Sequence, residues 1–133
     1  MINQNKLKLI GLMLYAGEGA KTGRTVDFIN TNPLLVKAFV NYLRMCCQID
    51  ENRLKFYLYC FEDQVVSDLI NYWCTELKVN SKQFTKPYIR SVHNKRNRIA
   101  AHGVIHVRYH SKELLINILF EINDTLKKYG RFA

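Results

Sequence analysis

An apolar run near the start of the chain, residues 9–15, ends in the sequence Ala-Gly-Glu-Gly and constrains the fold more than any other stretch. A helix that is apolar on every side needs burial on every side, so we expect a helix over residues 6–17 inside the molecule. Gly17 and Gly19 allow a tight turn or a close approach at its end. Glu18 then lies at the negative end of the helix dipole, where an acid is not stabilising. Either a cation binds beside this carboxylate, or Glu18 is simply solvated beyond a glycine cap.

The size of the chain favours one domain over residues 1–133, which is long enough to bury a core. Apolar residues make up 48% of the chain and charged residues 23%, which is ordinary for a globular protein. No apolar run has the length of a membrane span, and residues 1–8 lack the layout of a secretory signal. The four cysteines form no Cys-x-x-Cys pair, and no histidine stands at zinc-finger spacing from them. We therefore expect buried free thiols in a cytoplasmic protein, where the environment is reducing.

Positive charge is concentrated in one part of the chain, whose formal net charge is +9. Residues 81–110 hold seven basic residues and no acidic ones, whereas the rest holds thirteen basic and eleven acidic residues. The seven are Lys82, Lys86, Arg90, Lys95, Arg96, Arg98 and Arg108. A compact cationic block is typical of a protein that binds a phosphate backbone. A solvated basic loop is the plainer alternative.

Periodicity predicts eight elements in the order α-β-α-β-α-β-β-α, with room for one more short strand within residues 20–24. Residues 25–31 are rich in β-branched and aromatic residues and are expected to form the first strand. Asn32 and Pro33 then supply a capping side chain and a proline at the first helical position. The helix that they begin is expected to end near Gln48.

The second half of the chain is expected to hold a helix, two paired strands and a final helix. The third helix begins at Asp63, which is suited to capping it. Residues 88–92 and 103–109 are expected to pair as a hairpin, with residues 93–98 as its basic tip. Ser111 begins the last helix.

Residues 53–61 alternate cleanly between apolar side chains and a set of cations and tyrosines. Such alternation is typical of a strand with one buried and one exposed face. Together with the order of elements, it predicts an α+β fold: one twisted sheet, mixed or antiparallel, with helices on one face and the other face free. The free face is expected to carry Arg53, Lys55, Tyr57, Tyr59, Arg90, His106 and Arg108. Such a face can lie along nucleic acid, with cations for phosphates and tyrosine hydroxyls as donors, or it can simply be solvated.

Several enzyme signatures are missing from the sequence, among them Gly-x-Gly-x-x-Gly, the Walker loop and Gly-x-Ser-x-Gly. His106 and His110 fall on an expected strand, where their side chains would not converge on a metal. His93 and Asn94 suggest part of a His-Asn-His nuclease motif, but the second histidine is missing. The chemistry that remains is metal-assisted hydrolysis of a phosphodiester, with Glu18 as a ligand of the divalent ion.

Residues 14–19, Leu-Tyr-Ala-Gly-Glu-Gly, resemble the second part of the LAGLIDADG motif of homing endonucleases, a helix that ends in Asp or Glu followed by Gly. The longer run Leu-Tyr-Ala-Gly-Glu-Gly-Ala-Lys is similar to Leu-Tyr-Trp-Gly-Glu-Gly-Ala-Lys, found in a group of prokaryotic LAGLIDADG-like domains. Residues 26–30, the pair Lys86-Pro87 and residues 103–111 also resemble that group, so the resemblance covers nearly the whole chain. It implies the αββαββα core of the family with an extra helix.

The resemblance also implies a homodimer joined through the helix over residues 6–17, with the two sheets forming a saddle over duplex DNA. Glu18 of each copy would bind Mg²⁺ as the catalytic carboxylate, and the backbone carbonyl of Gly17 would be a second ligand. Lys86 and Arg90 are the basic residues expected near the scissile phosphate. The dimer interface would use Leu9, Leu12, Met13, Ala16 and Gly17. The DNA contacts would come from Lys21, Arg24, Arg53, Lys55, Tyr57, Tyr59, Lys82, Arg90, Lys95, Arg96, Arg98, His106 and Arg108.

The chain departs from the family pattern at Leu12 and Met13, where the family has alanine and glycine. Bulkier residues there would hold two helices further apart. Two functions therefore stay open, of which the first is Mg²⁺-dependent, site-specific cleavage of duplex DNA. The second is DNA or RNA binding without cleavage, as in transcription regulators and intron maturases with this fold. A third alternative is that the basic hairpin binds an acidic protein.

Overall fold

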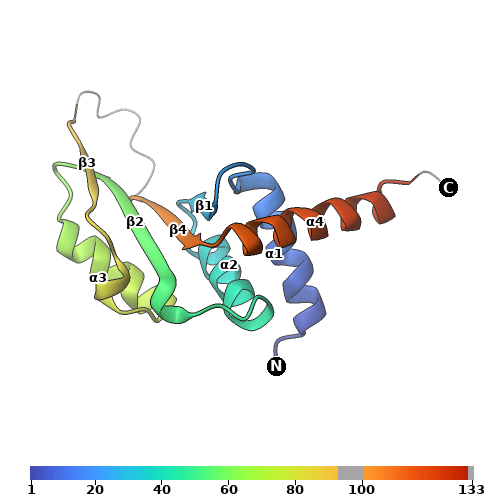
Figure 1. Ribbon diagram of the computed structural model, residues 1–133. Coiled ribbons are helices and arrows are strands. Elements are labelled where there is room, and N and C mark those ends of the chain that lie inside the picture. Colours follow the sequence, from blue (N-terminus) through green and yellow to red (C-terminus); the bar gives the residue numbers. More distant parts are fainter. Residues whose placement is uncertain (93–100, 132–133) are drawn as a thin grey trace.

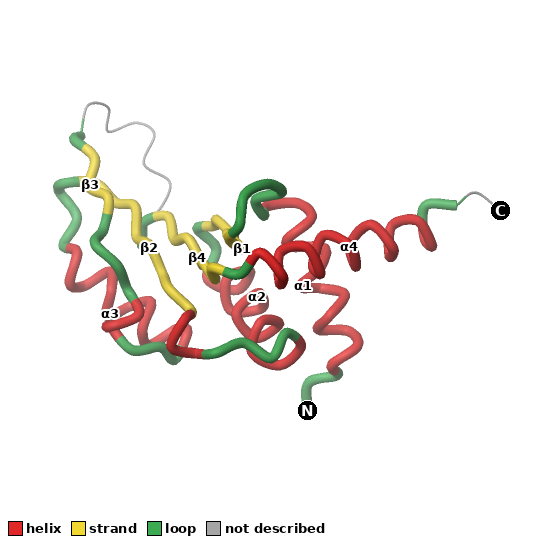
Figure 2. The backbone as a smooth tube through the Cα atoms, in the orientation of Figure 1, coloured by secondary structure: helices red, strands yellow, loops and turns green. Residues whose placement is uncertain are grey.

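The computed structural model describes residues 1–92 and 101–131 and shows an α+β fold (Figure 1). The helices are α1 (Gln4–Glu18), α2 (Pro33–Cys46), α3 (Val66–Leu77) and α4 (Lys112–Tyr129). The strands are β1 (Thr25–Asn30), β2 (Leu54–Phe61), β3 (Tyr88–Arg90) and β4 (Val104–His110), and the short 3-10 turns are η1 (Glu51–Arg53) and η2 (Ser81–Gln83). The path in Figure 2 confirms the predicted order α-β-α-β-α-β-β-α.

The four strands of the described chain form one mixed sheet in the order β1-β4-β2-β3. Strand β4 lies between β1 and β2 and runs antiparallel to both. Strand β3 pairs with β2 in the parallel sense, so the predicted hairpin between residues 88–92 and 103–109 is wrong. The reason is that α3 connects β2 to β3, and a strand–helix–strand crossover brings the second strand back in the direction of the first.

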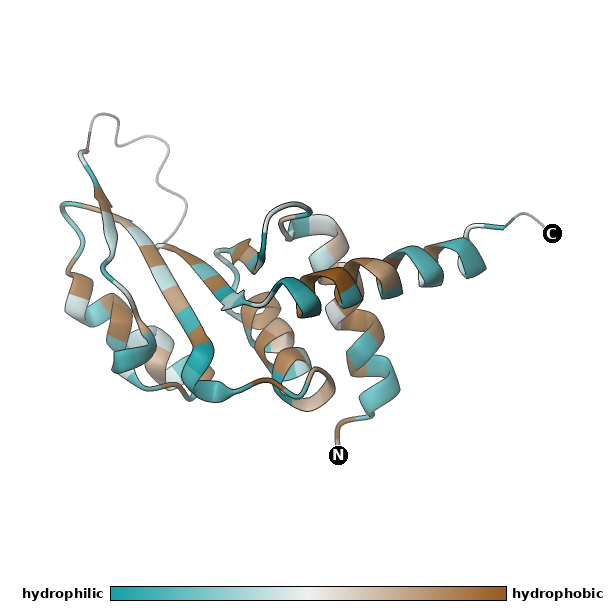
Figure 3. Cartoon of the chain, viewed as in Figure 1, coloured by the Kyte–Doolittle hydropathy of each residue, from teal (hydrophilic) through white to brown (hydrophobic). Residues whose placement is uncertain are grey.

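The sheet has two unlike faces because successive side chains of a strand point in opposite directions. Along β2, Leu54, Phe56 and Leu58 are fully buried, while the residues between them are partly exposed. Figure 3 shows the same alternation of polar and apolar residues along the strand. All four helices add side chains to one buried cluster with the apolar residues of β1, β2 and β4. The helices therefore cover one face of the sheet and leave the other open, as the alternation predicted.

Close packing fixes α1 against α2 and β1. A Cβ at Gly11 would lie 2.0 Å from the ring of Tyr42, so only glycine lets α1 and α2 approach this closely. Tyr15 is fully buried, and its hydroxyl donates to the carbonyl of Ala20 at 2.6 Å. The same hydroxyl accepts from the backbone N–H of Asp27 at 3.1 Å. These two hydrogen bonds attach the C-terminal end of α1 to β1 and to the loop before it.

Two of the three predicted helix starts are confirmed. The side chains of Asn32 and Ser111 each accept a hydrogen bond from a backbone N–H in the first turn of α2 and α4. The prediction that Asp63 caps α3 is wrong, since Val65 is the N-cap and makes no side-chain cap bond. The turn before α3 is held instead by the side chain of Gln64, which accepts from a backbone N–H of β2.

The four cysteines are free, as predicted, but only Cys60 is buried. Cys46, Cys47 and Cys74 are partly exposed. Burial raises the pKa of the Cys47 thiol to about 11, so this thiol stays protonated at neutral pH. Within residues 1–92 and 101–131, no helix combines the length and the apolar character that crossing a membrane requires.

Candidate nucleic-acid interface

The face of the sheet opposite the helices, called the open face below, is polar and aromatic. Strand register arranges its side chains in rows across β1, β4 and β2, such as the row of Asp27, Arg108 and Lys55. The open face comprises Thr25, Asp27, Ile29, Lys55, Tyr57, Tyr59, Val104, His106, Arg108 and His110, with Tyr88 of β3 paired beside Tyr59. The structure therefore gathers on one surface most of the residues that the alternation assigned to a free face.

One end of the open face is cationic. A hollow of about 440 Å³ is lined there by Thr25, Asp27, Arg53, Lys55, Tyr57, Arg108 and His110. Arg53 is the last residue of η1, and its guanidinium lies over the ring of Tyr109, 4.8 Å from the centroid. It also donates to the backbone carbonyl of His110. These contacts hold the guanidinium at the rim of the hollow, where it can meet an anion without first being ordered.

A carboxylate inside this hollow organises the basic residues around it. Oδ2 of Asp27 lies 3.1 Å from Nε of Arg108, and Oδ1 lies 3.0 Å from Nδ1 of His106. The guanidinium of Arg108 also lies over the ring of Tyr57, 4.0 Å from the centroid. Partial burial lowers the pKa of Arg108, but the Asp27 carboxylate and hydrogen bonds to Tyr59 and Tyr57 raise that pKa by more. Arg108 is therefore a permanent positive charge in a fixed position.

His106 supports this surface from within. Only 7% of the residue is exposed, and its ring stacks on that of Tyr59 with the centroids 4.5 Å apart. Its Nδ1 is engaged by Asp27. With so little of it exposed, His106 differs from the expectation that it contacts DNA directly, and its contacts position Tyr59 and Asp27 instead.

The other end of the open face is aromatic and apolar. The rings of Tyr59 and Tyr88 lie with their centroids 5.2 Å apart, and Tyr88 is 56% exposed. A second hollow, of about 250 Å³, is lined by Ile29, Tyr59, Cys60, Phe61, Arg90, Val104 and His106. Ile29 is 40% exposed beside it. Exposed apolar residues scattered singly need no explanation, but a group that surrounds a hollow marks a candidate binding surface.

The other predicted contact residues surround the open face or lie outside the described residues. Lys21 and Arg24 are exposed in the loop that leads into β1. Arg90 is exposed on the edge strand β3, and Lys82 and Lys86 are exposed in the segment before it. Lys95, Arg96 and Arg98 lie outside the described residues. The basic residues of this predicted set that the structure describes thus lie at both edges of the sheet as well as on its open face.

Glu18 lies at the opposite side of the sheet from its expected basic partners. It is the exposed last residue of α1, and its neighbour Gly19 forms a bridge with Phe28 of β1. Lys86 and Arg90 lie in or beside β3, at the other edge. Three inter-strand spacings separate the two edge strands, which amounts to roughly 14 Å. One chain therefore does not bring the carboxylate together with these two basic residues.

The predicted magnesium site is incomplete within one chain. In the described part of the chain, no three His, Cys, Asp or Glu side chains gather where they could hold a metal ion. Gly17 and Glu18 are exposed and offer one main-chain carbonyl and one carboxylate. Mg²⁺ takes an octahedron of oxygen ligands, with one or two carboxylates, waters and substrate phosphates among them. The two groups of one chain do not form such a site unless a second chain or a bound phosphate adds to them.

Helix α1 has apolar residues that remain exposed at the surface of the chain. Leu12 is 3% exposed and packs inside the chain's own core, which corrects its assignment to a dimer interface. Leu9 and Ile10 are 46% and 49% exposed, so the expectation that α1 is buried on every side is wrong within one chain. The remaining predicted interface residues are Met13 and Ala16, which are partly exposed, and Gly17, which is exposed.

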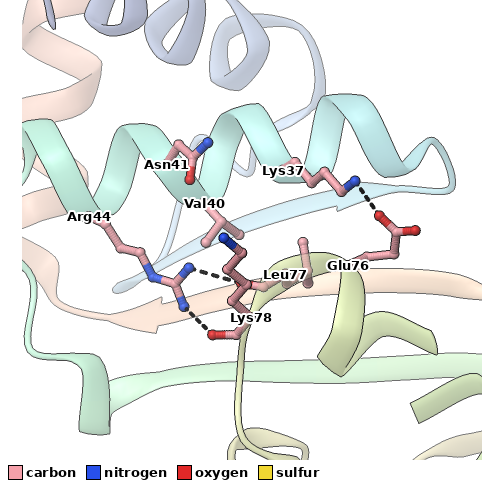
Figure 4. A pocket seen from close by; sticks show the side chains of 7 residues that line it. All are labelled: Lys37, Val40, Asn41, Arg44, Glu76, Leu77 and Lys78. Carbon is pink, nitrogen blue, oxygen red and sulfur yellow. Dashed lines mark hydrogen bonds and ion pairs between the residues drawn. The ribbon is translucent and has the colours of Figure 1, made fainter. Parts of the chain in front are cut away.

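A further pocket lies between α2 and the end of α3 (Figure 4). Arg44 donates from Nη1 to the carbonyl of Leu77 at 2.9 Å, and its Nε and Nη2 bind both carboxylate oxygens of Glu51. Lys37 forms an ion pair with Glu76. Lys37, Arg44 and Glu76 are thus engaged in ion pairs, and the bonds of Lys37 and Arg44 to residues of α3 hold the C-terminal end of that helix against α2. We interpret the pocket as part of the structural framework.

Comparison of the chain with protein-family models, with curated proteins and with solved structures gave no match. The geometry of the open face is therefore what indicates the function. Two residues important to that geometry, Asp27 and Tyr88, were not among the predicted contact residues. The polar–apolar alternation of β1 could have indicated Asp27, but only the strand register shows that it meets Arg108 and His106.

Proposed function

We propose that this chain binds nucleic acid through the open face of its sheet. The observation that carries the proposal is the placement of cations and of partly or fully exposed tyrosines on one side of the same strands. Arg53, Lys55 and Arg108 line one hollow, and Tyr59 and Tyr88 lie further along the same face. Cations match the phosphate backbone, and aromatic rings match the faces of bases.

An acidic protein is the rival partner, and the aromatic end of the face argues against it. Carboxylates would satisfy the cations around the first hollow, but they offer nothing to the exposed rings and to Ile29. Nucleic acid offers both phosphate charge and flat apolar surface within the same few ångströms. The two ends of the open face are therefore explained by one ligand.

Fluorescence anisotropy with a labelled oligonucleotide tests the proposal. We expect binding that weakens steeply between about 50 and 200 mM salt, because neutralising phosphates releases counterions. The double variant Arg53→Gln/Lys55→Gln should bind more weakly, and the slope of log Kd against log salt should fall by roughly 0.7–0.9 per lost phosphate contact. Lys127→Gln, at an exposed position near the end of α4, is the matched control. Binding that is absent at low salt, or equal in the double variant and the control, would refute the proposal.

Mg²⁺-dependent cleavage of duplex DNA by a homodimer is a second candidate. The observation that favours it is the strip of exposed apolar residues on α1, which includes Leu9 and Ile10 and lies on the helix that ends at the exposed Glu18. Two chains that pair through this strip would bring two carboxylates near each other and place two open faces side by side. This arrangement follows from the LAGLIDADG resemblance and requires duplex DNA across the two open faces.

Cleavage of supercoiled DNA in the presence of Mg²⁺ tests the second candidate. Wild-type protein should cut, Glu18→Gln should not, and Glu113→Gln, at an exposed position at the start of α4, should behave as wild type. The mass in solution, measured by light scattering, should be that of two chains. Equal cutting by wild type and Glu18→Gln would remove Glu18 from the reaction, and a monomer in solution would remove the shared site.

A further inference from the structure

We propose that the open face takes a single nucleic-acid strand, with an unpaired base held at its aromatic end and phosphates at its cationic end. This inference rests on the proposed nucleic-acid binding and names the form of the ligand. It starts from the difference between the two hollows of the open face. One is lined largely by charged and polar residues, and the other largely by apolar and aromatic residues.

A ladder of rings runs across the sheet at the aromatic end. His106 of β4 stacks on Tyr59 of β2 with centroids 4.5 Å apart, and Tyr59 lies 5.2 Å from Tyr88 of β3. His106 is almost fully buried at one end of the ladder, while Tyr88 is more than half exposed at the other. A base that stacks on Tyr88 would therefore extend a series of rings whose inner members, Tyr59 and His106, are already held in place.

The apolar hollow beside these rings disfavours a duplex. In a double helix the base faces are covered by their neighbours, and a protein meets only phosphates and the base edges in the grooves, so no base face is free to stack on an exposed ring. Arg90 is the one cation that lines this hollow, and the other lining residues offer apolar or aromatic surface, which suits a base better than a row of phosphates. An unpaired base has two free faces, and it can place one of them on the exposed ring of Tyr88, beside the partly exposed Tyr59.

The spacing along β2 suits a strand that crosses both ends of the face. Lys55, Tyr57 and Tyr59 lie on the same face of one strand, and Lys55 and Tyr59 are separated by about 13 Å at the usual rise per residue. Tyr57 lies between them, and the guanidinium of Arg108 covers its ring. A short stretch of extended strand is long enough to contact the cationic hollow and the aromatic ladder together.

The test compares three labelled ligands of equal length: a single-stranded oligothymidine, the same backbone with abasic residues, and a duplex. We expect the single strand to bind roughly tenfold more tightly than the abasic strand, because stacking on an aromatic ring contributes about this much per base. Tyr59→Leu and Tyr88→Ala should each weaken binding of the single strand several-fold and leave binding of the abasic strand unchanged. Tyr59→Phe keeps the ring, although it removes the hydrogen bond to Arg108, and should keep the preference for the base-containing strand over the abasic strand. Tyr129→Ala, at an exposed tyrosine near the end of α4, is the matched control.

The outcomes separate this inference from the function on which it rests. Equal affinity for the abasic and the base-containing strand, or tighter binding of the duplex, would overturn the inference and leave nucleic-acid binding in place. No binding of any of the three ligands at low salt would overturn both. Weaker binding by the tyrosine variants to the abasic strand as well would mean that the rings only support the sheet, and that result also overturns the inference. Circular dichroism of each variant shows whether the fold is retained.

Discussion

The two faces of the sheet are built from the same strands and serve opposite purposes. On the helix-covered face, Phe28, Phe56 and Val107 are fully buried. They belong to one hydrophobic cluster that also includes side chains from all four helices. On the open face, the residues that alternate with them include a carboxylate, several cations and a row of tyrosines. The first face is completed by the chain itself. The second is completed only in part, since exposed rings and cations remain, and this difference is what indicates a ligand.

The largest effect is expected on the helix-covered face. Phe56 is fully buried in the core, with 0% of its surface exposed. Phe56→Ala should therefore lower the free energy of unfolding by about 3–5 kcal/mol. Phe120 is 69% exposed on α4, and Phe120→Ala should change that free energy by no more than about 0.5 kcal/mol. Urea unfolding measures both. Similar losses for the two variants would contradict the assignment of the core.

The next effect is expected where the open face has its own internal order. Asp27→Ala would leave Arg108 and the buried His106 without their shared carboxylate, so we expect a loss of about 1–3 kcal/mol. Asp124→Ala removes an exposed carboxylate that pairs with Lys128 on α4, and it should cost no more than about 0.5 kcal/mol. If thermal unfolding shows equal stability for Asp27→Ala and wild type, the carboxylate does not organise the surface.

A smaller effect on folding separates ligand contacts from structural ones. Lys55 is partly exposed, and no ion pair of the described residues includes it. Lys55→Gln should therefore change the free energy of unfolding by no more than about 0.5 kcal/mol while it weakens nucleic-acid binding. The same sample can be used for urea unfolding and for anisotropy. A large loss of stability would show that Lys55 serves the fold rather than a ligand.

The smallest effect concerns a charge pair on the helix side of the molecule. A hydrogen bond from Arg44 lowers the pKa of Glu51 below its ordinary value, burial opposes this, and Gln83 adds to the lowering. Because the pKa is lowered by folding, the pair stabilises the protein above the ordinary pKa of Glu51, and this contribution is lost as the pH falls through the lowered value. Arg44→Gln should therefore reduce stability near neutral pH and match wild type more closely in acid. Curves of unfolding temperature against pH that stay parallel would contradict the pairing.

The sequence was informative where local chemistry decides the structure. The alternation of residues 53–61 predicted which side chains share a face, and Asn32 and Ser111 predicted two helix starts, because these features depend on neighbours in the chain. Strand pairing depends on distant residues, and it was predicted less well. Strand β3 has three residues and joins β2 rather than β4, although a helix between two strands is itself a signal for parallel pairing.

The candidate site shows the same division. Lys55, Tyr57, Tyr59 and Arg108 could be assigned to a free face from the strand period alone. The burial of His106 could not, because it results from cross-strand contacts with Asp27 and Tyr59 that only the register creates. Nor could the separation of Glu18 from Arg90, since it depends on the order of strands in the sheet.

Photo-crosslinking tests most directly whether the open face is the surface that binds. A single-stranded oligonucleotide that carries 4-thiouracil would be irradiated with the wild-type protein, and the attached peptides identified by mass spectrometry. We expect crosslinks to Tyr59 and Tyr88, which line the aromatic end of the face, and competition by unlabelled strand. Crosslinks confined to α1 and α4, with none on β2 or β3, would contradict the account.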